Sequence, residues 1–102
     1  MERDVDLAFI KLHILHHAAK EPVFGLGLIE ELGTHGYALS PGTLYPVLGK
    51  LCQQGLLSVR TQVVHHKQRK YYRTTPQGDV LLARLRHKVR ELSRELLEEA
   101  SP

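Results

Sequence analysis

The sequence lacks the residues that mark several classes of protein. Cys52 is the only cysteine in 102 residues, so an internal disulfide and a cysteine-rich metal site are excluded. No apolar run reaches the roughly 18 residues that a membrane helix needs. The first residues, Met1 to Asp4, are as acidic as they are basic and do not resemble a signal peptide. We therefore expect a cytoplasmic, single-domain protein.

Catalytic patterns are missing as well. The chain shows no activated nucleophile, no phosphate-binding loop and no paired carboxylates in an apolar setting, so we expect neither an enzyme nor a cofactor. Hydrophobic residues make up 42% and charged residues 25%, which is the balance of a folded domain. The formal net charge of +3 permits an anionic partner without demanding one.

Acidic residues are absent from one long segment. Between Leu56 and Thr75 there is no Asp or Glu, whereas five basic residues lie there. A local field of one sign is what contact with phosphate requires. The alternative is that these charges protect a sheet edge from unwanted pairing. The basic residues of this segment are Arg60, Lys67, Arg69, Lys70 and Arg73.

The first part of the chain predicts two helices. Asp4 or Asp6 can cap the first helix, which we expect to run to about Lys20. The second helix is expected from about Leu26 to Thr34, where glycines suit its end. The apolar residues expected to face the core are Leu7, Ile10, Ile14, Leu15, Ala18, Leu28, Ile29 and Leu32.

A third helix follows, with Ser40 as its N-cap and Pro41 as its first residue. A proline inside a helix loses a backbone hydrogen bond. Because Pro46 would lie inside this helix, a later start near Thr43 stays open. We expect the helix to end at Gly55. Its apolar residues are spaced for one helical face: Leu44, Val47, Leu48 and Leu51.

The pattern then changes to that of a β-hairpin. Leu56 to Val64 is rich in Val, Leu and Thr, and Arg69 to Thr74 contains two tyrosines of high strand propensity. We expect one face of the first strand to carry Leu57, Val59, Thr61 and Val63. The polar residues 65–68, His-His-Lys-Gln, are expected to form the turn, although they lack the Asn-Gly or Asp-Gly signal of a tight hairpin.

The last helix is expected to start with Thr75 as its cap and Pro76 as its first residue and to reach about Glu99. Its leucines and valine are spaced three and four apart, as in the seam of a coiled coil. The seam residues are Leu82, Leu85, Val89, Leu92 and Leu96. They could instead serve the domain's own core, but a helix of roughly 35 Å is longer than a small domain can cover. We therefore expect this seam to form a homodimer interface.

Three helices, a hairpin and a long helix are the order of a winged helix-turn-helix protein. The predicted fold class is mainly α with a two-stranded β wing and a long C-terminal dimerisation helix. We expect residues 1–75 to form the DNA-binding domain and residues 76–102 the dimerisation helix. The second and third helices would make the helix-turn-helix, with the third as the recognition helix.

The outward face of the third helix is suited to DNA. Thr43, Tyr45 and Lys50 can hydrogen-bond, stack and neutralise phosphate, and Gly42 allows close approach. Ser40, at the cap, is expected near a phosphate because helix N-termini attract anions. The alternative is an ordinary amphipathic surface helix. The predicted DNA-binding residues are Ser40, Gly42, Thr43, Tyr45, Lys50, Lys67, Arg69 and Lys70.

Two blocks resemble a known family. Residues 40–46, Ser-Pro-Gly-Thr-Leu-Tyr-Pro, and residues 69–74, Arg-Lys-Tyr-Tyr-Arg-Thr, are together similar to the PadR family of bacterial transcriptional regulators, in its short subclass with a single C-terminal helix. Leu48, Leu51 and Gly55 between the blocks also fit. The resemblance implies a homodimer that binds a pseudo-palindromic operator in double-stranded DNA, usually as a repressor released by a small ligand.

The chain departs from that family pattern in three places. Residues 24–26 read Phe-Gly-Leu where members commonly carry His-Gly-Tyr, and residues 65–68 replace a turn that is usually glycine-rich. Some members hold planar aromatic drugs between tryptophans, whereas this chain has no tryptophan. The polar and aromatic contacts of the His-Gly-Tyr motif are therefore missing, and we do not expect that mode of ligand binding.

Two alternative functions stay open. A winged-helix adaptor would use the same face to bind a protein instead of DNA. His13 and His17 are four residues apart on the first helix and can share a metal, as in a metal-responsive regulator. The simpler interpretation is a solvated helix face, so we assign no metal. Cys52 is expected to be a small buried apolar residue and not a redox sensor.

Overall fold

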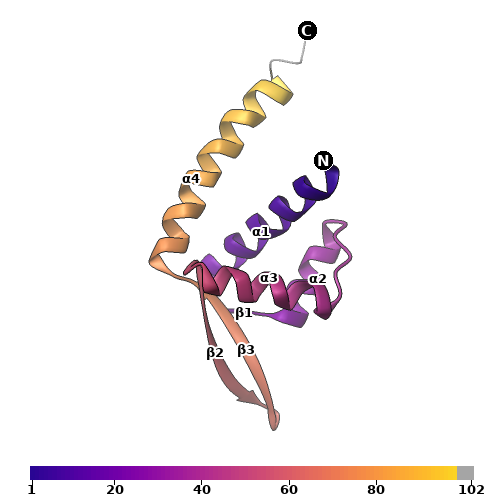
Figure 1. The fold of residues 1–102 in the computed structure, drawn as a ribbon, viewed down its shortest axis with the longest axis vertical. Helices are drawn as coiled ribbons and strands as arrows, with labels where there is room; N and C mark the ends of the chain where they lie inside the picture. Colours follow the sequence, from indigo (N-terminus) through magenta and orange to yellow (C-terminus); the bar gives the residue numbers. More distant parts are fainter. Residues whose placement is uncertain (99–102) are drawn as a thin grey trace.

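The computed structural model describes residues 1–98 and shows an elongated molecule of 58 × 29 × 21 Å. In Figure 1 the helix α4 extends from one end and the β2–β3 hairpin from the other, with α1, α2 and α3 between them. The elements are α1 (Glu2–Lys20), β1 (Val23–Phe24), α2 (Gly25–Thr34), α3 (Pro41–Gln53), β2 (Leu57–Val64), β3 (Lys67–Thr74), α4 (Pro76–Ser93) and a π-helical turn, Arg94–Glu98. The predicted winged helix-turn-helix is confirmed.

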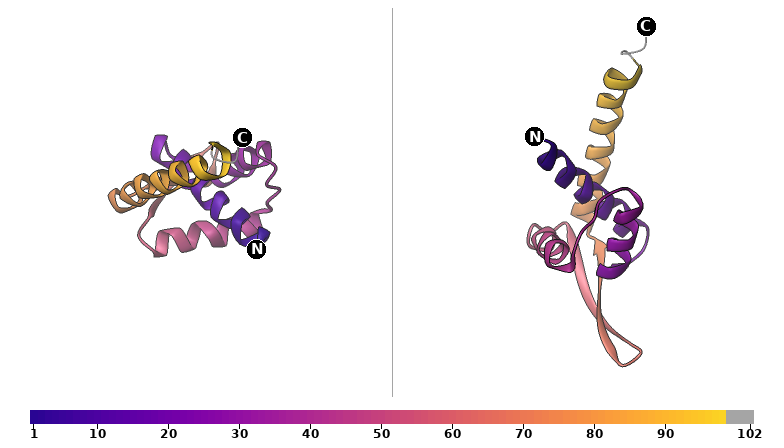
Figure 2. Two further views of the ribbon diagram at one scale, coloured as in Figure 1. Left: turned by 90° about the horizontal axis from the view of Figure 1, so that it is seen from above. Right: turned by 90° about the vertical axis from the view of Figure 1, so that its right-hand side faces the viewer.

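One core joins the helices to the base of the wing. Its centre is α1, which packs on α2, β3 and α4, as two further views also show (Figure 2). The predicted stripes of α1, α2 and α3 face this core, except that Leu7 is exposed and Ile29 and Val47 are half-buried. The buried residues are Ile10, Ile14, Leu15, Ala18, Leu28, Leu32, Leu44, Leu48, Leu51, Leu57, Tyr72 and Leu82.

The sheet has three strands and not the two that the sequence predicts. The strand order is β1-β3-β2, and β1 pairs antiparallel with β3 through Val23 opposite Tyr72 and Phe24 opposite Tyr71. A strand of two residues shows no alternation, so periodicity does not reveal it. This pairing ties the start of α2, which begins directly at Gly25, to the wing.

The hairpin turn is shorter than predicted. β3 begins at Lys67 instead of Arg69, and the turn consists of His65 and His66 alone, with φ of 50° and 64°. Positive φ at both central residues is the requirement of a tight type I′ turn, whose twist matches that of the strands. Histidine tolerates this region better than most residues. Of the alternate β2 residues expected on one face, only Leu57 is buried.

The helix boundaries correct or confirm several expectations. α1 begins at Glu2 with Met1 as its N-cap, so neither Asp4 nor Asp6 caps it, although acidic residues in a first turn favour the helix dipole. α3 begins at Pro41 with Ser40 as N-cap and contains Pro46, which excludes the later start. Since Pro46 has no N–H, it leaves the carbonyl of Gly42 without its usual helical donor.

The junction between wing and α4 is held by Thr75. Its hydroxyl accepts a hydrogen bond from the Gly78 amide at 2.9 Å and donates to the Gly55 carbonyl at 2.6 Å, which confirms the predicted cap. The predicted helix end at Glu99 and the last part of the predicted dimerisation helix, residues 99–102, lie outside the described residues. Among the described helices none is long and apolar enough to cross a membrane.

Gly78 provides a test of this junction. A Cβ at this buried position would overlap the carbonyl oxygen of Leu56, so we expect Gly78→Ala to destabilise the fold by about 1–3 kcal/mol. A Cβ at Gly33, also helical, would meet no described atom within 4 Å beyond its own helix backbone. Gly33→Ala should therefore stabilise by about 0.5–1 kcal/mol. Urea unfolding measures both, and a neutral Gly78→Ala would contradict the close contact.

Candidate nucleic-acid interface

α3 has one face in the core and the other in solvent. Leu44, Leu48 and Leu51 are buried, whereas Tyr45 and Lys50 are exposed. This arrangement follows from the apolar spacing of the sequence, because residues three and four apart share a helix face. Gly42, Thr43 and Gly49 are exposed as well. The outer face of α3 is therefore accessible to a partner.

At the start of α3 the amide of Gly42 is the backbone N–H left for an anion, because Pro41 has none and the Thr43 amide donates to the Ser40 carbonyl at 3.1 Å. The Ser40 hydroxyl does not cap the helix backbone; it lies 3.2 Å from the Thr43 hydroxyl instead. The first amides of a helix have no partner within the helix, and they attract negative groups such as phosphate. Two hydroxyls and the Gly42 amide thus form a polar, exposed end of α3.

Tyr45 leans across the start of α2. Its side chain is 40% exposed, and its phenol lies so close to Gly25 that a Cβ on that residue would overlap it. The glycine is what permits this contact between the two helices of the helix-turn-helix. Sequence reasoning missed the role of Gly25, although a glycine at the first position of α2 was a visible signal.

The structure brings Tyr45 and the basic tip of the wing to one concave surface. A hollow of about 570 Å³ lies between α3, the start of α2 and the hairpin. It is lined by Phe24, Gly25, Leu26, Tyr45, Val64, His65, Lys67, Gln68, Arg69 and Lys70. The other four predicted DNA-binding residues, Ser40, Gly42, Thr43 and Lys50, lie on α3 or its cap outside this hollow.

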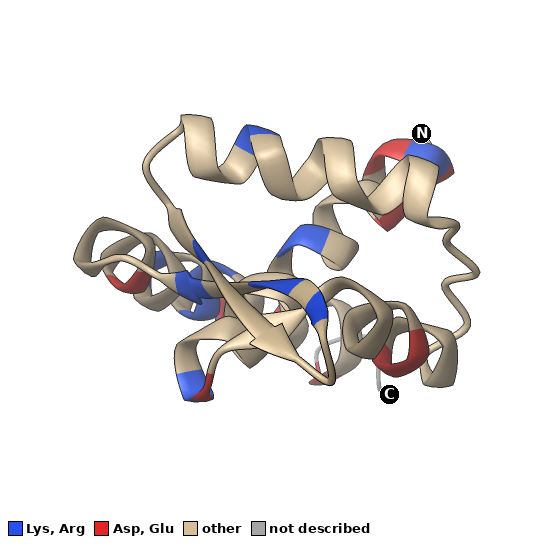
Figure 3. Cartoon of the chain, turned by 90° about the horizontal axis from the view of Figure 1, so that it is seen from below, with Lys and Arg blue, Asp and Glu red and all other residues tan. Residues whose placement is uncertain are grey.

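The charges of the wing are of one sign, as Figure 3 shows on the strands. Arg69 lies over the ring of Phe24, with 4.2 Å from its guanidinium carbon to the ring centroid, a cation–π contact that orients the side chain. Phe24 also packs edge-on against Tyr71. Although neighbouring residues of a strand point to opposite faces, Arg69 and Lys70 both line the hollow.

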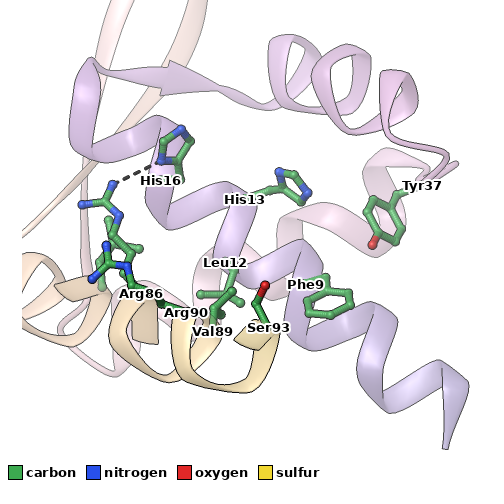
Figure 4. Close-up of a pocket in the computed structure, with 10 residues that line it drawn as sticks. Phe9, Leu12, His13, His16, Tyr37, Arg86, Val89, Arg90 and Ser93 are labelled. Atoms are coloured by element: carbon green, nitrogen blue, oxygen red, sulfur yellow. Dashed lines mark hydrogen bonds between the residues drawn. The ribbon is translucent and has the colours of Figure 1, made fainter. Parts of the chain in front are cut away.

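The exposed part of the predicted seam lies at the far end of α4. Leu82 is buried in the domain's own core and Leu85 packs against it, whereas Val89, Leu92 and Leu96 are 48%, 56% and 61% exposed. Next to these residues, a groove of about 530 Å³ runs between α1 and α4 (Figure 4). It is lined by Phe9, Leu12, His13, His16, Tyr37, Leu82, Arg86, Val89, Arg90 and Ser93.

The histidines of α1 fall into two settings. His16 accepts a hydrogen bond from Arg86 of α4 at 3.2 Å, and burial together with nearby Lys20 holds the pKa of His16 below its usual value. His13 and His17 instead meet His35, just beyond α2. His35 was not predicted from the sequence, although its position four residues after Glu31 matches the spacing of the α1 pair.

Known proteins share both the sequence pattern and the fold of this chain. Residues 14–84 match the model of the transcriptional regulator PadR-like family. The chain belongs to that family. It is 47% identical over 95 residues to Transcriptional regulator Rv3488 of Mycobacterium tuberculosis, covering 93% of this chain and 89% of that protein. The PadR-like chain is therefore a transcriptional regulator and not an enzyme.

Solved structures agree with the assignment to the PadR-like family. A PadR-like transcription factor from Bacteroides fragilis has a TM-score of 0.82 at 27% identity, covering 97% of both chains. A PadR family transcriptional regulator from Eggerthella lenta has a TM-score of 0.82 at 29% identity, covering 99% of this chain and 89% of that one. The fold and the family expected from the two sequence blocks are thus confirmed.

Cys52 of the PadR-like chain is half-buried beside the core. Burial raises the pKa of its thiol, and nearby Lys70 opposes this less strongly. A raised pKa leaves less thiolate at neutral pH, and the thiolate is the reactive form.

We therefore expect Cys52 to react slowly with a disulfide reagent. At pH 8 the native protein should react more slowly than the urea-unfolded protein, because the raised pKa leaves less thiolate and burial limits access to the sulfur. The absorbance of the released thiolate measures both rates, with Cys52→Ser as the blank. A native rate equal to the unfolded rate would indicate an activated thiol.

Proposed function

We propose that the chain is a sequence-specific repressor that works as a homodimer, binds a pseudo-palindromic operator and is released by a small ligand. The observation that carries the proposal is that Tyr45 of α3 shares one concave surface with Lys67, Arg69 and Lys70. These three basic residues belong to the segment 56–75, which contains no acid. The proposal also places the protein in the cytoplasm, because a repressor has to reach its operator there.

In this proposal α3 enters the major groove of DNA. Thr43, Tyr45 and Lys50 face the groove, because the opposite face of α3 is buried. The Ser40 hydroxyl and the Gly42 amide approach a phosphate, and Gly42 lets the backbone come close. Base edges in the major groove distinguish all four base pairs, so this face supplies the sequence preference.

The wing contributes affinity more than sequence preference. Lys67 and Lys70 are exposed near the tip of the hairpin, where an ammonium group can reach a phosphate. The guanidinium of Arg69, steadied by Phe24, is held at the rim of the same hollow. Contacts of this kind fix the register of a protein on DNA without reading the bases.

The proposed dimer uses α4. Val89, Leu92 and Leu96 continue the stripe that begins at the buried Leu82, and exposing such a stripe to water is unfavourable. A twofold partner covers the same stripe on both chains. With two recognition helices the dimer could read operator half-sites about 34–36 Å apart, one helical turn of DNA.

The groove between α1 and α4 is the proposed effector site (Figure 4). Phe9, Leu12 and Val89 give it apolar walls, and Arg86 and Arg90 supply positive charge. This combination suits a small apolar compound that carries an acidic group. Because α4 is the proposed dimer helix, a ligand that binds one dimer geometry better than another shifts the pair of recognition helices.

The direct test of DNA binding selects bound duplexes from a random pool. We expect an enriched site with twofold symmetry, and an affinity that falls with salt with a log–log slope of about −3.6 or steeper, because four or more phosphates per dimer are neutralised. A lack of enrichment, together with no binding to any duplex at low salt, would instead favour a protein partner for this face.

Two variants separate sequence reading from phosphate contact. Tyr45→Ala should cost about 1–3 kcal/mol on the selected operator and little on random DNA. Lys70→Ala should weaken both duplexes alike and reduce the salt slope by about one per subunit. Fluorescence anisotropy measures both, with Lys88→Ala on the exposed side of α4 as a control of equal charge change. Equal losses for Tyr45→Ala and Lys70→Ala on both duplexes would contradict these roles.

The dimer helix has a matched pair of sites. Leu92 is 56% exposed on the stripe, and Val80 is 60% exposed on the opposite side of α4. Leu92→Asp should shift the protein to a monomer and lower operator affinity at least about tenfold, since two linked half-sites bind more tightly than one. Val80→Asp should leave the dimer intact. Sedimentation measures the mass of each variant, and a stable dimer of Leu92→Asp would overturn the assignment of the stripe.

A further inference from the structure

Three imidazoles, two from α1 and one from the residue that follows α2, converge on one point. His13 and His17 lie on α1, and His35 lies directly after α2. One ring nitrogen of each lies within 4.8 Å of the others. The carboxylate of Glu31 contacts two of them, with its Oε1 3.3 Å from Nε2 of His17 and 3.3 Å from Nε2 of His35.

The convergence follows from helix geometry. His13 and His17 are four residues apart on α1, and Glu31 and His35 are four apart at the end of α2, so each pair shares one side of its helix. Backbone hydrogen bonds from the amides of His35 and Tyr37 to the Leu32 carbonyl, both 3.0 Å, fix the turn that follows α2. The rings of His13 and His35 stack with centroids 4.3 Å apart.

Their spacing is close to that of a tetrahedral metal site. With bonds of about 2.0–2.1 Å to the metal, two ligand atoms of such a site lie about 3.3 Å apart. The two distances from Glu31 to His17 and His35 already have this value. The ring nitrogen of His13, within 4.8 Å of those of His17 and His35, has to come closer, which a rotation of its imidazole can supply.

A polar cluster without a metal explains this arrangement less well. One carboxylate oxygen of Glu31 lies 3.3 Å from an imidazole nitrogen of both His17 and His35, and the ring of His13 stacks on that of His35. Burial, aided by His35 and His17, holds the pKa of His13 below its usual value. Neutral imidazole is the form that binds a metal. Three imidazoles and one carboxylate that converge from separate segments of the chain form a ligand set and not a solvated helix face.

We propose that His13, His17, His35 and Glu31 bind one divalent transition-metal ion of the zinc class. Three nitrogens and one oxygen suit Zn²⁺ or Ni²⁺, whereas Mg²⁺ prefers oxygen ligands and octahedral geometry. The ion would join α1 to the end of α2, on residues other than those assigned to DNA. The site needs neither DNA nor an effector, so its test is independent of the proposed function.

The test is calorimetric titration of the metal-free full chain with Zn²⁺. We expect one ion per chain and a rise in melting temperature, because a ligand that binds only the folded state stabilises it. His35→Gln and Glu31→Gln should each weaken binding by more than about tenfold, since loss of even an indirect metal contact costs about that much. Titration with Mg²⁺ should give no binding under the same conditions.

His16→Gln is the matched control. It removes one histidine from the same helix but none of the proposed ligands, so its zinc affinity should equal that of the wild type. His35 is exposed, and circular dichroism of metal-free His35→Gln should show an unchanged fold. The proposal fails if the wild type binds no zinc, if His35→Gln binds as tightly as the wild type, or if His16→Gln loses as much affinity as His35→Gln.

Discussion

The packing of α1 is the interaction on which the other parts of the molecule depend. Ile14 and Ala18 are fully buried, and the helix that carries them contacts α2, β3 and α4. Fully burying a side chain such as Ile14 contributes about 1.5–3 kcal/mol, so these contacts account for a large part of the stability of a small domain. The helix-turn-helix, the wing and α4 are therefore all positioned against the same helix.

The size of this core sets a limit on α4. Along one stripe of that helix, exposure rises from 3% at Leu82 to 61% at Leu96, because the domain has no further surface with which to cover it. The sequence keeps the same apolar spacing over the whole stripe. An apolar residue gains nothing from exposure to water, and this continued spacing is the physical argument for the proposed twofold partner.

The sequence predicts the elements that repeat a pattern and misses the features made by contacts between elements. The spacing of Leu44, Leu48 and Leu51 identifies both α3 and its buried face, and Thr75 followed by Pro76 identifies the start of α4. The two-residue β1 has no pattern of its own and forms only because β3 lies beside it. Periodicity within one segment carries no information on such pairings.

The same limit applies to the candidate sites. Tyr45 was expected on the DNA face, but its contact with Gly25 depends on the angle at which α2 and α3 pack. The partners of His13 and His17 come from the end of α2 and the turn after it, well separated from them along the chain. Spacing along one helix identified the pair on α1, and only the packing of α1 against α2 identified His35 and Glu31 as their neighbours.

His13 connects the two proposed ligand sites. Its side chain lines the groove between α1 and α4 and also belongs to the histidine cluster that faces α2. If a metal ion holds this imidazole toward α2, the wall of the groove is fixed in one position. Any effect of the metal on affinity for a ligand in the groove must then be matched by an equal effect of that ligand on affinity for the metal. Through α1, both would act on the proposed dimer helix and on the first helix of the helix-turn-helix, which are the two elements that set the position of α3 relative to its twofold copy.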